Sequence, residues 1–392
     1  MNYLRLIPIY FIFSTYLFSY EYKGEFGVDG VAYAKYTDEI LTYGDMDISF
    51  KNSYFDTTAR AEFIYSSKYT DRRYLLINEL YITKEFDDYV LSFGKKIKYW
   101  GELEGYNIAD VYNQKNYLKD PFDKSAKYGT VGFDITRYYD ENFIEFGMKL
   151  YEDDIYYPKT GTPYAPFPLP YEKELHLSDK SYTPTYYLSA SFLDDSFVES
   201  ETKLVLLHGY DTKRDIIKTS ATLLSQYAYR VNKALLLSHI IYADTIFKTE
   251  LSYTDVIEYT PISDYTQLSF GVEKSFYELM GSDITFYGEY YRYLYKDDNK
   301  VKGVDISEIY DDDIFLALRF SFNDVRGTEM KFGVLEDIKK DERVVKISIN
   351  SRIMDSFILN GEYLNIISNE TTTLLNQFDN SSRFILGVEY TF

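Results

Sequence analysis

Apolar and polar residues alternate along the last ten residues of the chain, RFILGVEYTF. Every second side chain from Phe384 to Phe392 is apolar or aromatic, and those between are mostly small or charged. Successive side chains of a strand point to opposite faces of a sheet. The segment therefore predicts a strand with one wholly apolar face.

The same alternation recurs along the chain, in segments near 59–65, 144–150, 314–322, 329–334 and 345–352. No sustained helical period competes with it. The number of such segments predicts 16 or 18 strands. The alternation changes phase between Phe50 and Phe55, which divides the 46–66 region into two strands and favours 18.

Short and long connections alternate between these segments. The short ones are 85–88, 139–142, 194–197, 279–283, 323–327 and 354–356. The long ones are 101–127, 152–181, 296–311, 336–342 and 368–382. This rhythm predicts an all-β fold, a transmembrane antiparallel β-barrel with short periplasmic turns and long outer loops. Aromatic residues near strand ends, such as Tyr138-Tyr139 and the tyrosines of 290–295, are typical of the girdles at membrane interfaces.

A soluble sandwich has the same alternation, but the aromatic strand ends, the alternating loop lengths and the even strand count favour a membrane barrel. The first residues indicate that the chain is exported. Arg5 precedes an uncharged apolar run from Leu6 to Ser19, shorter than the ~20 residues of a spanning helix. We interpret residues 1–19 as a cleaved signal peptide. Residues 20–392 are then one barrel domain in the outer membrane of a Gram-negative bacterium, inserted by the barrel-assembly machinery. A soluble secreted sandwich remains a third, weaker alternative.

Composition excludes several functions. The net charge of −20 argues against nucleic-acid binding, and the absence of cysteine removes disulfides, thiol catalysis and Cys-ligated zinc. His176, His208 and His239 lie far apart in sequence without metal-ligand spacing. We therefore expect no enzyme, no cofactor and no metal. Asp311-Asp312-Asp313 offers oxygen ligands for a divalent cation, but a solvated loop end is the simpler interpretation.

The most unusual stretch follows a strand that ends near Gly94. It contains Trp100, the single tryptophan, and is neither alternating nor helical. Loops of this length in compact domains are usually functional. We hypothesise that 99–127 folds into the lumen and constricts the pore. The residues placed beside the passage would be Lys96, Lys98, Glu102, Glu104 and Asp110. The alternatives are a loop packed on the outer rim and a plug that seals the barrel.

This stretch resembles a family of Gram-negative outer-membrane porin-like proteins that carry a Gly-Arg-Gln strand end, Trp-Gly-Glu and an Asp-x-x-Asn-Pro stretch. The matching positions are Gly94, Trp100, Gly101, Glu102, Asp110 and Asn113. Lys95 and Lys96 replace Arg-Gln, and Gln114 replaces the proline, as in a divergent member. The resemblance implies a β-barrel channel but no substrate. The C-terminus, with Val388, Tyr390 and a final Phe392, resembles the assembly signal of outer-membrane barrels.

Charged residues on the second face of the predicted strands are candidates to line the pore. They are Arg60, Glu62, Glu145, Lys149, Arg319, Lys346, Arg352, Glu362, Arg383 and Glu389. Both signs are present, so ion preference does not follow. We expect a porin for small hydrophilic solutes or ions, with the lipid bilayer as partner and a homo-oligomer as one assembly. The alternative is a non-conducting barrel acting as an adhesin or anchor.

A second long segment, 152–181, overlaps a proline-rich stretch, because residues 158–184 hold six of the nine prolines. Proline cannot occupy the interior of a central strand. We expect an extended outer loop over the mouth of the barrel. A proline segment that binds a partner is the alternative.

Overall fold

The computed structural model describes residues 19–196, 198–279 and 281–392. The predicted signal peptide therefore lies outside the described residues, apart from Ser19, which begins β1. Among the described residues, no helix has the length and apolar character needed to cross a membrane.

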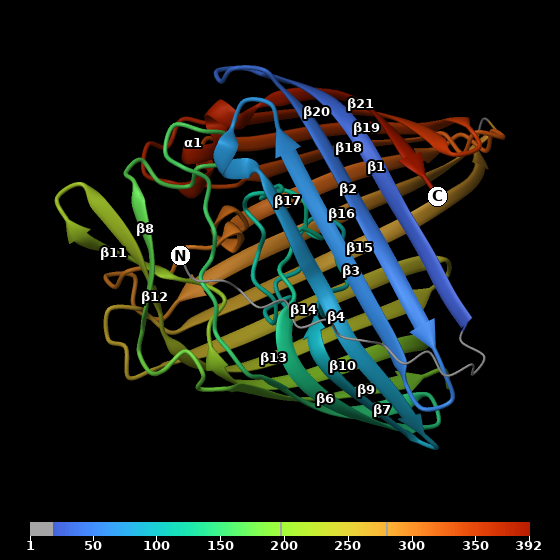
Figure 1. Cartoon of the computed structure of the whole chain (residues 1–392), viewed down its shortest axis with the longest axis horizontal. Helices are drawn as coiled ribbons and strands as arrows, with labels where there is room; N and C mark the ends of the chain where they lie inside the picture. The colour runs from blue at the N-terminus through green and yellow to red at the C-terminus, as the bar shows by residue number, and fades with distance from the viewer. Residues whose placement is uncertain (1–18, 197, 280) are drawn as a thin grey trace, which may run out of the picture.

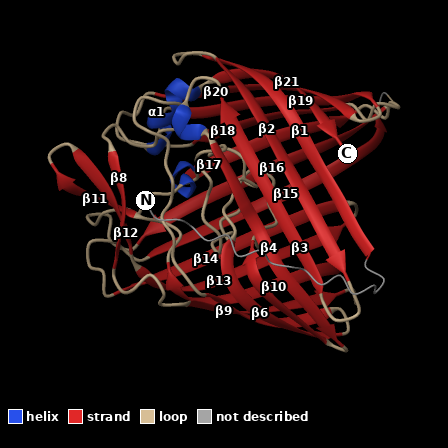
Figure 2. Cartoon of the chain, in the orientation of Figure 1, coloured by secondary structure: helices blue, strands red, loops and turns tan. Residues whose placement is uncertain are grey.

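Eighteen antiparallel strands form one closed barrel, which confirms the predicted class and the higher strand count (Figures 1 and 2). Strands that follow one another along the barrel are paired, and β1 closes the ring by pairing with β21. The predicted break between Phe50 and Phe55 is confirmed by the turn between β2 and β3. The strands are β1 Ser19–Tyr33, β2 Glu39–Lys51, β3 Asp56–Ser66, β4 Tyr74–Phe86, β5 Tyr89–Lys96, β6 Thr130–Tyr139, β7 Asn142–Lys149, β9 Thr185–Asp194, β10 Glu199–Tyr210, β13 Arg230–Tyr242, β14 Thr245–Ile257, β15 Tyr265–Leu279, β16 Ser282–Tyr295, β17 Asp312–Ser321, β18 Glu329–Asp337, β19 Glu342–Met354, β20 Phe357–Ser368 and β21 Arg383–Thr391.

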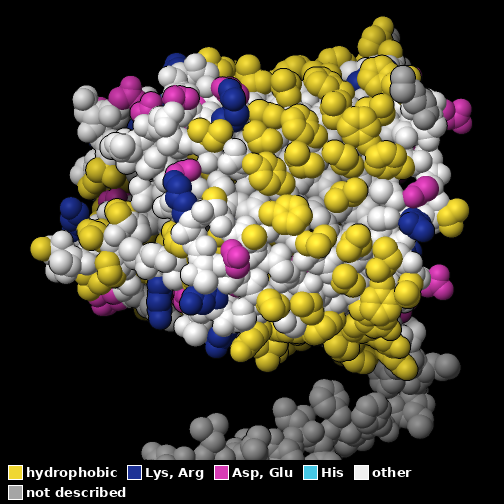
Figure 3. Space-filling model, turned by 90° about the horizontal axis from the view of Figure 1, so that it is seen from above, with side chains coloured by type: hydrophobic (Ala, Val, Ile, Leu, Met, Phe, Trp, Pro, Cys, Tyr) yellow, Lys and Arg dark blue, Asp and Glu magenta, His cyan; other side chains and the backbone are white. Residues whose placement is uncertain are grey.

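The alternating apolar and polar residues of each strand form the outer and inner surfaces of this barrel. In β21, Phe384 and Leu386 are 50% and 53% exposed on the outside, whereas Arg383 is 3% exposed on the inside. Figure 3 shows hydrophobic side chains spread over the barrel wall, with charged side chains gathered mainly toward its ends. An apolar exterior around a polar interior is the arrangement that lipid requires.

The connections sort to the two ends of the barrel. At one end, the turn end, the strands are joined tightly, and residues such as Asp87, Asp140, Ala243 and Asp244 have positive φ. Two-residue hairpins favour such conformations because their twist matches that of the strands. The long connections gather at the opposite end, the loop end, as the sequence predicted. The connection predicted as long at 336–342 is short, because β18 extends to Asp337 and β19 begins at Glu342.

The loop end carries structure of its own. β8 (Tyr171–Leu177), β11 (Asp215–Ser220) and β12 (Leu223–Ala228) form a small separate sheet beyond the barrel (Figure 1). A short helix, α1 (Leu374–Phe378), and the 3-10 turns η1 (Thr70–Arg72), η2 (Ile306–Ile309) and η3 (Asp379–Ser381) lie in other connections. β8 follows Pro170, so part of the segment expected to be an extended loop forms a strand once the prolines end.

One expectation about the aromatic girdle is wrong. Tyr291 and Tyr293 are 0% and 5% exposed and lie on the inner face of β16, not at the lipid interface. Their positions follow from strand parity, because Glu289 lies two residues earlier on the same inner face. Tyr138 and Tyr139, at the turn end of β6, are both 44% exposed.

Candidate functional site: the barrel lumen

The connection between β5 and β6, residues 97–129, enters the lumen from the loop end; we call it the lumen segment. Figure 1 shows it in teal inside the ring of strands. It lacks regular secondary structure. Its contacts with inward side chains of strands all around the barrel define where it lies.

Two carboxylates hold the segment against one wall. Glu250 of β14 accepts hydrogen bonds from the backbone N–H groups of Glu102 (2.7 Å) and Ala109 (3.0 Å). Glu289 of β16 accepts from the N–H groups of Glu104 (2.7 Å) and Gly105 (2.9 Å). Both oxygens of each carboxylate thus accept hydrogen bonds from the backbone of the segment.

The opposite wall binds the later part of the segment. The Asn78 side chain of β4 donates to the carbonyl of Lys127 (2.8 Å) and accepts from the N–H of Gly129 (2.7 Å). Arg383 of β21 donates to Asp120 (2.7 Å). β4 and β16 stand on opposite sides of the ring, because the same number of strands separates them in either direction. The segment therefore crosses the lumen.

The residues of the family-like motif build the entry of the segment. Gly94 has a φ of +139°, and an added Cβ would lie 2.3 Å from the carbonyl oxygen of Leu80. Trp100 is buried against the rings of Tyr187 (5.1 Å) and Tyr112 (5.6 Å).

Asn113 ties the two ends of the segment together. Its side chain accepts from the N–H of Lys98 (2.7 Å) and donates to the carbonyl of Tyr128 (2.9 Å). Gly101 faces Asn107 so closely that an added Cβ would lie 2.1 Å from its Cγ. The motif positions that the sequence singled out therefore have structural roles.

The charged residues predicted for the passage form ion pairs. In the lumen segment and β5, Lys98 pairs with Glu145 (3.0 Å), Lys96 with Asp134 (3.4 Å), Glu104 with Lys331 (3.3 Å) and Asp110 with Lys127, whereas Glu102 contacts the Nδ1 atom of His239 (3.2 Å). On the strands, Arg60 meets Asp45 (2.7 Å), Lys149 meets Glu152 (2.6 Å), Glu362 meets both Lys346 (2.9 Å) and Arg383 (2.7 Å), and Lys119 of the segment meets Glu62 (3.5 Å).

Three predicted residues have other contacts. Arg319 donates to the Thr285 hydroxyl (3.3 Å), Glu389 accepts from the Tyr43 hydroxyl (3.3 Å), and Arg352 donates to the carbonyl of Asp355 at the turn end. Arg352 is therefore remote from the lumen segment along the strand. Mixed charge along the lumen, as the sequence predicted, thus takes the form of many local ion pairs.

Burial and ion pairing shift the pKa values of groups in the lumen segment. Burial lowers the pKa of Lys115 to about 8. Burial raises the pKa of Asp110 above its ordinary value, although Lys127 opposes the shift. For Glu104, burial acts upward, but Lys124 and Lys331 together lower its pKa below the ordinary value. Glu104 is therefore a carboxylate at neutral pH.

Two cavities flank the segment. One, of about 330 Å³, lies between Glu104–Lys124 of the segment and strands β16 to β20. The other, of about 200 Å³, lies against β1, β2 and β3. Asp123 borders both. The described residues thus leave space on either side of the segment.

Sequence reasoning missed the residues that fasten the segment. Glu250, Glu289 and Asn78 were not among the candidates, and neither was Arg72, which donates to the carbonyls of Leu118 (3.3 Å) and Lys119 (3.4 Å). Glu250 and Glu289 are acidic residues at inward positions of clearly alternating strands. This was the one feature of the sequence that could have marked them as candidates. Their targets are backbone N–H groups of a distant segment, which no sequence pattern marks.

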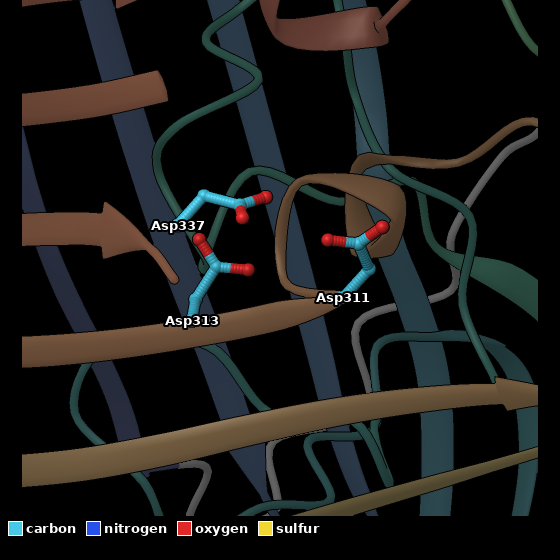
Figure 4. Close-up of side chains that lie close together, drawn as sticks. All are labelled: Asp311, Asp313 and Asp337. Atoms are coloured by element: carbon cyan, nitrogen blue, oxygen red, sulfur yellow. The ribbon is translucent and has the colours of Figure 1, made fainter. Parts of the chain in front are cut away.

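The acidic run at the start of β17 is partly neutralised by a lysine. Figure 4 shows Asp311, Asp313 and Asp337 close together, with their nearest carboxylate oxygens within 4.8 Å of one another. Lys340 bonds Asp311 (2.6 Å) and approaches Asp337 (3.4 Å). A lysine ammonium thus already provides positive charge to this cluster.

The chain's fold is that of known outer-membrane proteins. No protein-family model matches the chain, and no curated protein sequence is similar to it. The structure is similar to OccK5 of Pseudomonas aeruginosa (TM-score 0.54, 10% identity, 96% of this chain and 98% of that chain). It is also similar to P. aeruginosa OccK2, solved in complex with glucuronate (0.55, 10%, 95% and 98%).

A third similar structure is Wzi of Escherichia coli, a carbohydrate-binding β-barrel involved in group 1 capsule assembly (0.56, 9%, 95% and 84%). At such low identities the likeness concerns the fold alone. The chain has an 18-stranded antiparallel β-barrel fold similar to the folds of these outer-membrane proteins.

Proposed function

We propose that this chain is a passive outer-membrane channel for small hydrophilic solutes or ions, constricted by its lumen segment. One observation carries the proposal: the segment crosses a barrel whose inner face is polar and charged, and cavities remain on both sides of it. Polar lumens with an inward-folded connection suit selective diffusion. OccK2, which shares the fold, binds glucuronate.

The pore-lining role extends to the inward charges of both walls, from Arg60 and Glu62 to Arg319, Lys346 and Arg383. Because these groups other than Arg319 are held in ion pairs, we expect selectivity to come from the charges that face the cavities beside the segment. Catalysis has no part in this function, and neither does a cofactor.

The rival function is a non-conducting barrel, an adhesin or anchor, with the segment as its seal. The extensive bonding of the segment to opposite walls favours this rival. Wzi shows that a barrel of this fold can bind carbohydrate in capsule assembly.

Deletion of 102–116 tests the proposal against the rival. A constriction predicts that the unaltered protein conducts and that the deletion raises its unit conductance severalfold. A seal predicts that only the deletion variant conducts. Heat-dependent gel mobility of each protein shows that the barrel has folded, and equal conductance of the two would refute the constriction.

A further inference from the structure

The cavity between the lumen segment and strands β16 to β20 combines an apolar wall with a group of cations. Its volume of about 330 Å³ lies at the lower end of the range of ligand pockets. Phe315, Leu335 and Val344 supply apolar surface from three adjacent strands, and Phe122 supplies it from the segment. A ligand that fills this space must bury an apolar body.

The charged lining of the cavity is predominantly basic, with four basic and two acidic side chains. Arg319 of β17 and Lys331 of β18 are direct partners in the strand register, both pointing inward. Like charges directly opposite each other destabilise a strand pair. Their juxtaposition therefore favours an anion between or beside them.

Carboxylates of the protein pair with only some of these basic side chains. Glu104 lies 3.3 Å from Lys331 and 3.4 Å from Lys124, and Lys346 pairs with Glu362. Arg319, by contrast, has no carboxylate partner among the described residues. Its contacts are the Thr285 hydroxyl and the ring of Tyr287, whose centroid is 5.8 Å away, and its Nε is buried without a hydrogen-bond partner.

We propose that this cavity binds a small organic carboxylate with an apolar body, and that Arg319 holds the carboxylate. A guanidinium presents donors in a planar fork that matches a carboxylate, and no carboxylate of the described residues pairs with that of Arg319. The apolar strands beside it accommodate the hydrocarbon part, which phosphate or sulfate lacks. Binding itself is independent of conduction, but a role in transport rests on the proposed channel function.

Titration calorimetry of the detergent-solubilised full chain tests the site, with cyclohexanecarboxylate as the probe and cyclohexanecarboxamide as its neutral counterpart. We expect the acid to bind at least about tenfold more tightly than the amide, as for a hydrogen bond to a charged group. Equal affinity would overturn the proposal, and this comparison requires no variant.

Arg319→Gln should lower the affinity for the acid by about tenfold or more. Arg352→Gln is the matched control, because it removes an arginine at the turn end, outside the cavity lining. Unchanged affinity in a folded Arg319→Gln variant, shown by heat-dependent gel mobility, would also overturn the assignment. Saturable binding of the acid without any ion current in bilayers would refute the channel but leave the site. Ion current with equal affinities for acid and amide would refute the site but leave the channel.

Discussion

The contact between Glu250 and the lumen segment gives the sharpest prediction of the structure. Glu250→Gln keeps the shape of the side chain, but it replaces one acceptor oxygen with an NH₂ group. One of the two N–H groups now bound, that of Glu102 or that of Ala109, would then face a donor. A buried donor that loses its acceptor costs about 1–3 kcal/mol. With one acceptor kept and one lost, the local docking free energy should fall by about 1–3 kcal/mol.

Hydrogen exchange reports this loss directly. A change of about 1–3 kcal/mol corresponds to about 5- to 150-fold faster exchange at the amides of Glu102 and Ala109, if exchange requires local release of the segment. Peptides that cover 100–110 would show it by mass spectrometry. The amides of Glu104 and Gly105, bound by Glu289, should respond less.

Glu273→Gln is the matched control for this experiment. Glu273 also lies in the lumen, on the neighbouring strand β15, but it pairs with Lys248 (2.6 Å) and not with the segment. Exchange in 100–110 should be the same in this variant as in the unaltered protein. Unchanged exchange in Glu250→Gln, or equal acceleration in both variants, would refute the reasoning that Glu250 fastens the segment.

Two further predictions concern the strand end and the pH response. Gly94→Ala should destabilise the barrel by about 1–3 kcal/mol because of the positive φ and the close carbonyl of Leu80. Denaturant unfolding measures this loss of stability. Gly281→Ala is a milder control at positive φ, because an added Cβ there meets nothing within 4 Å. Because the pKa of Glu104 is lowered in the folded chain, its contribution to stability is present above its ordinary pKa of 4.5 and is lost as the pH falls through the folded value. Acidification should therefore release the segment near Lys331 and raise the noise of the channel current. Glu104→Gln should remove that part of the pH response. The same acid response in the variant and the unaltered protein would contradict this role of Glu104.

The fold was predictable because lipid imposes a strict rule on each strand. An apolar exterior and a polar interior force a period of two, so the alternation in 314–322 and 383–392 indicates both the strands and their faces. The change of phase before Phe55 was enough to place a turn. Aromatic content alone was a poor guide at Tyr291 and Tyr293. Their position near a strand end predicted a membrane girdle, but their place in the alternation of β16 puts them on its inner face.

The lumen segment was predictable only in outline. Its length, its single tryptophan and its lack of period marked it as special, and the structure places it inside the barrel. Its fastening by Glu250, Glu289 and Asn78 depends on backbone groups that meet these side chains across the lumen. Such contacts join residues far apart in sequence, and with a single sequence nothing in the local pattern identifies them.

Single-channel recording in planar bilayers tests the central claim most directly. The mature chain, refolded and shown by heat-dependent gel mobility to be a folded barrel, would be measured in a salt gradient. We predict discrete conductance steps and a reversal potential different from zero, because charges line the passage beside the segment. A correctly folded barrel that inserts but carries no current would contradict the channel and identify the lumen segment as a seal.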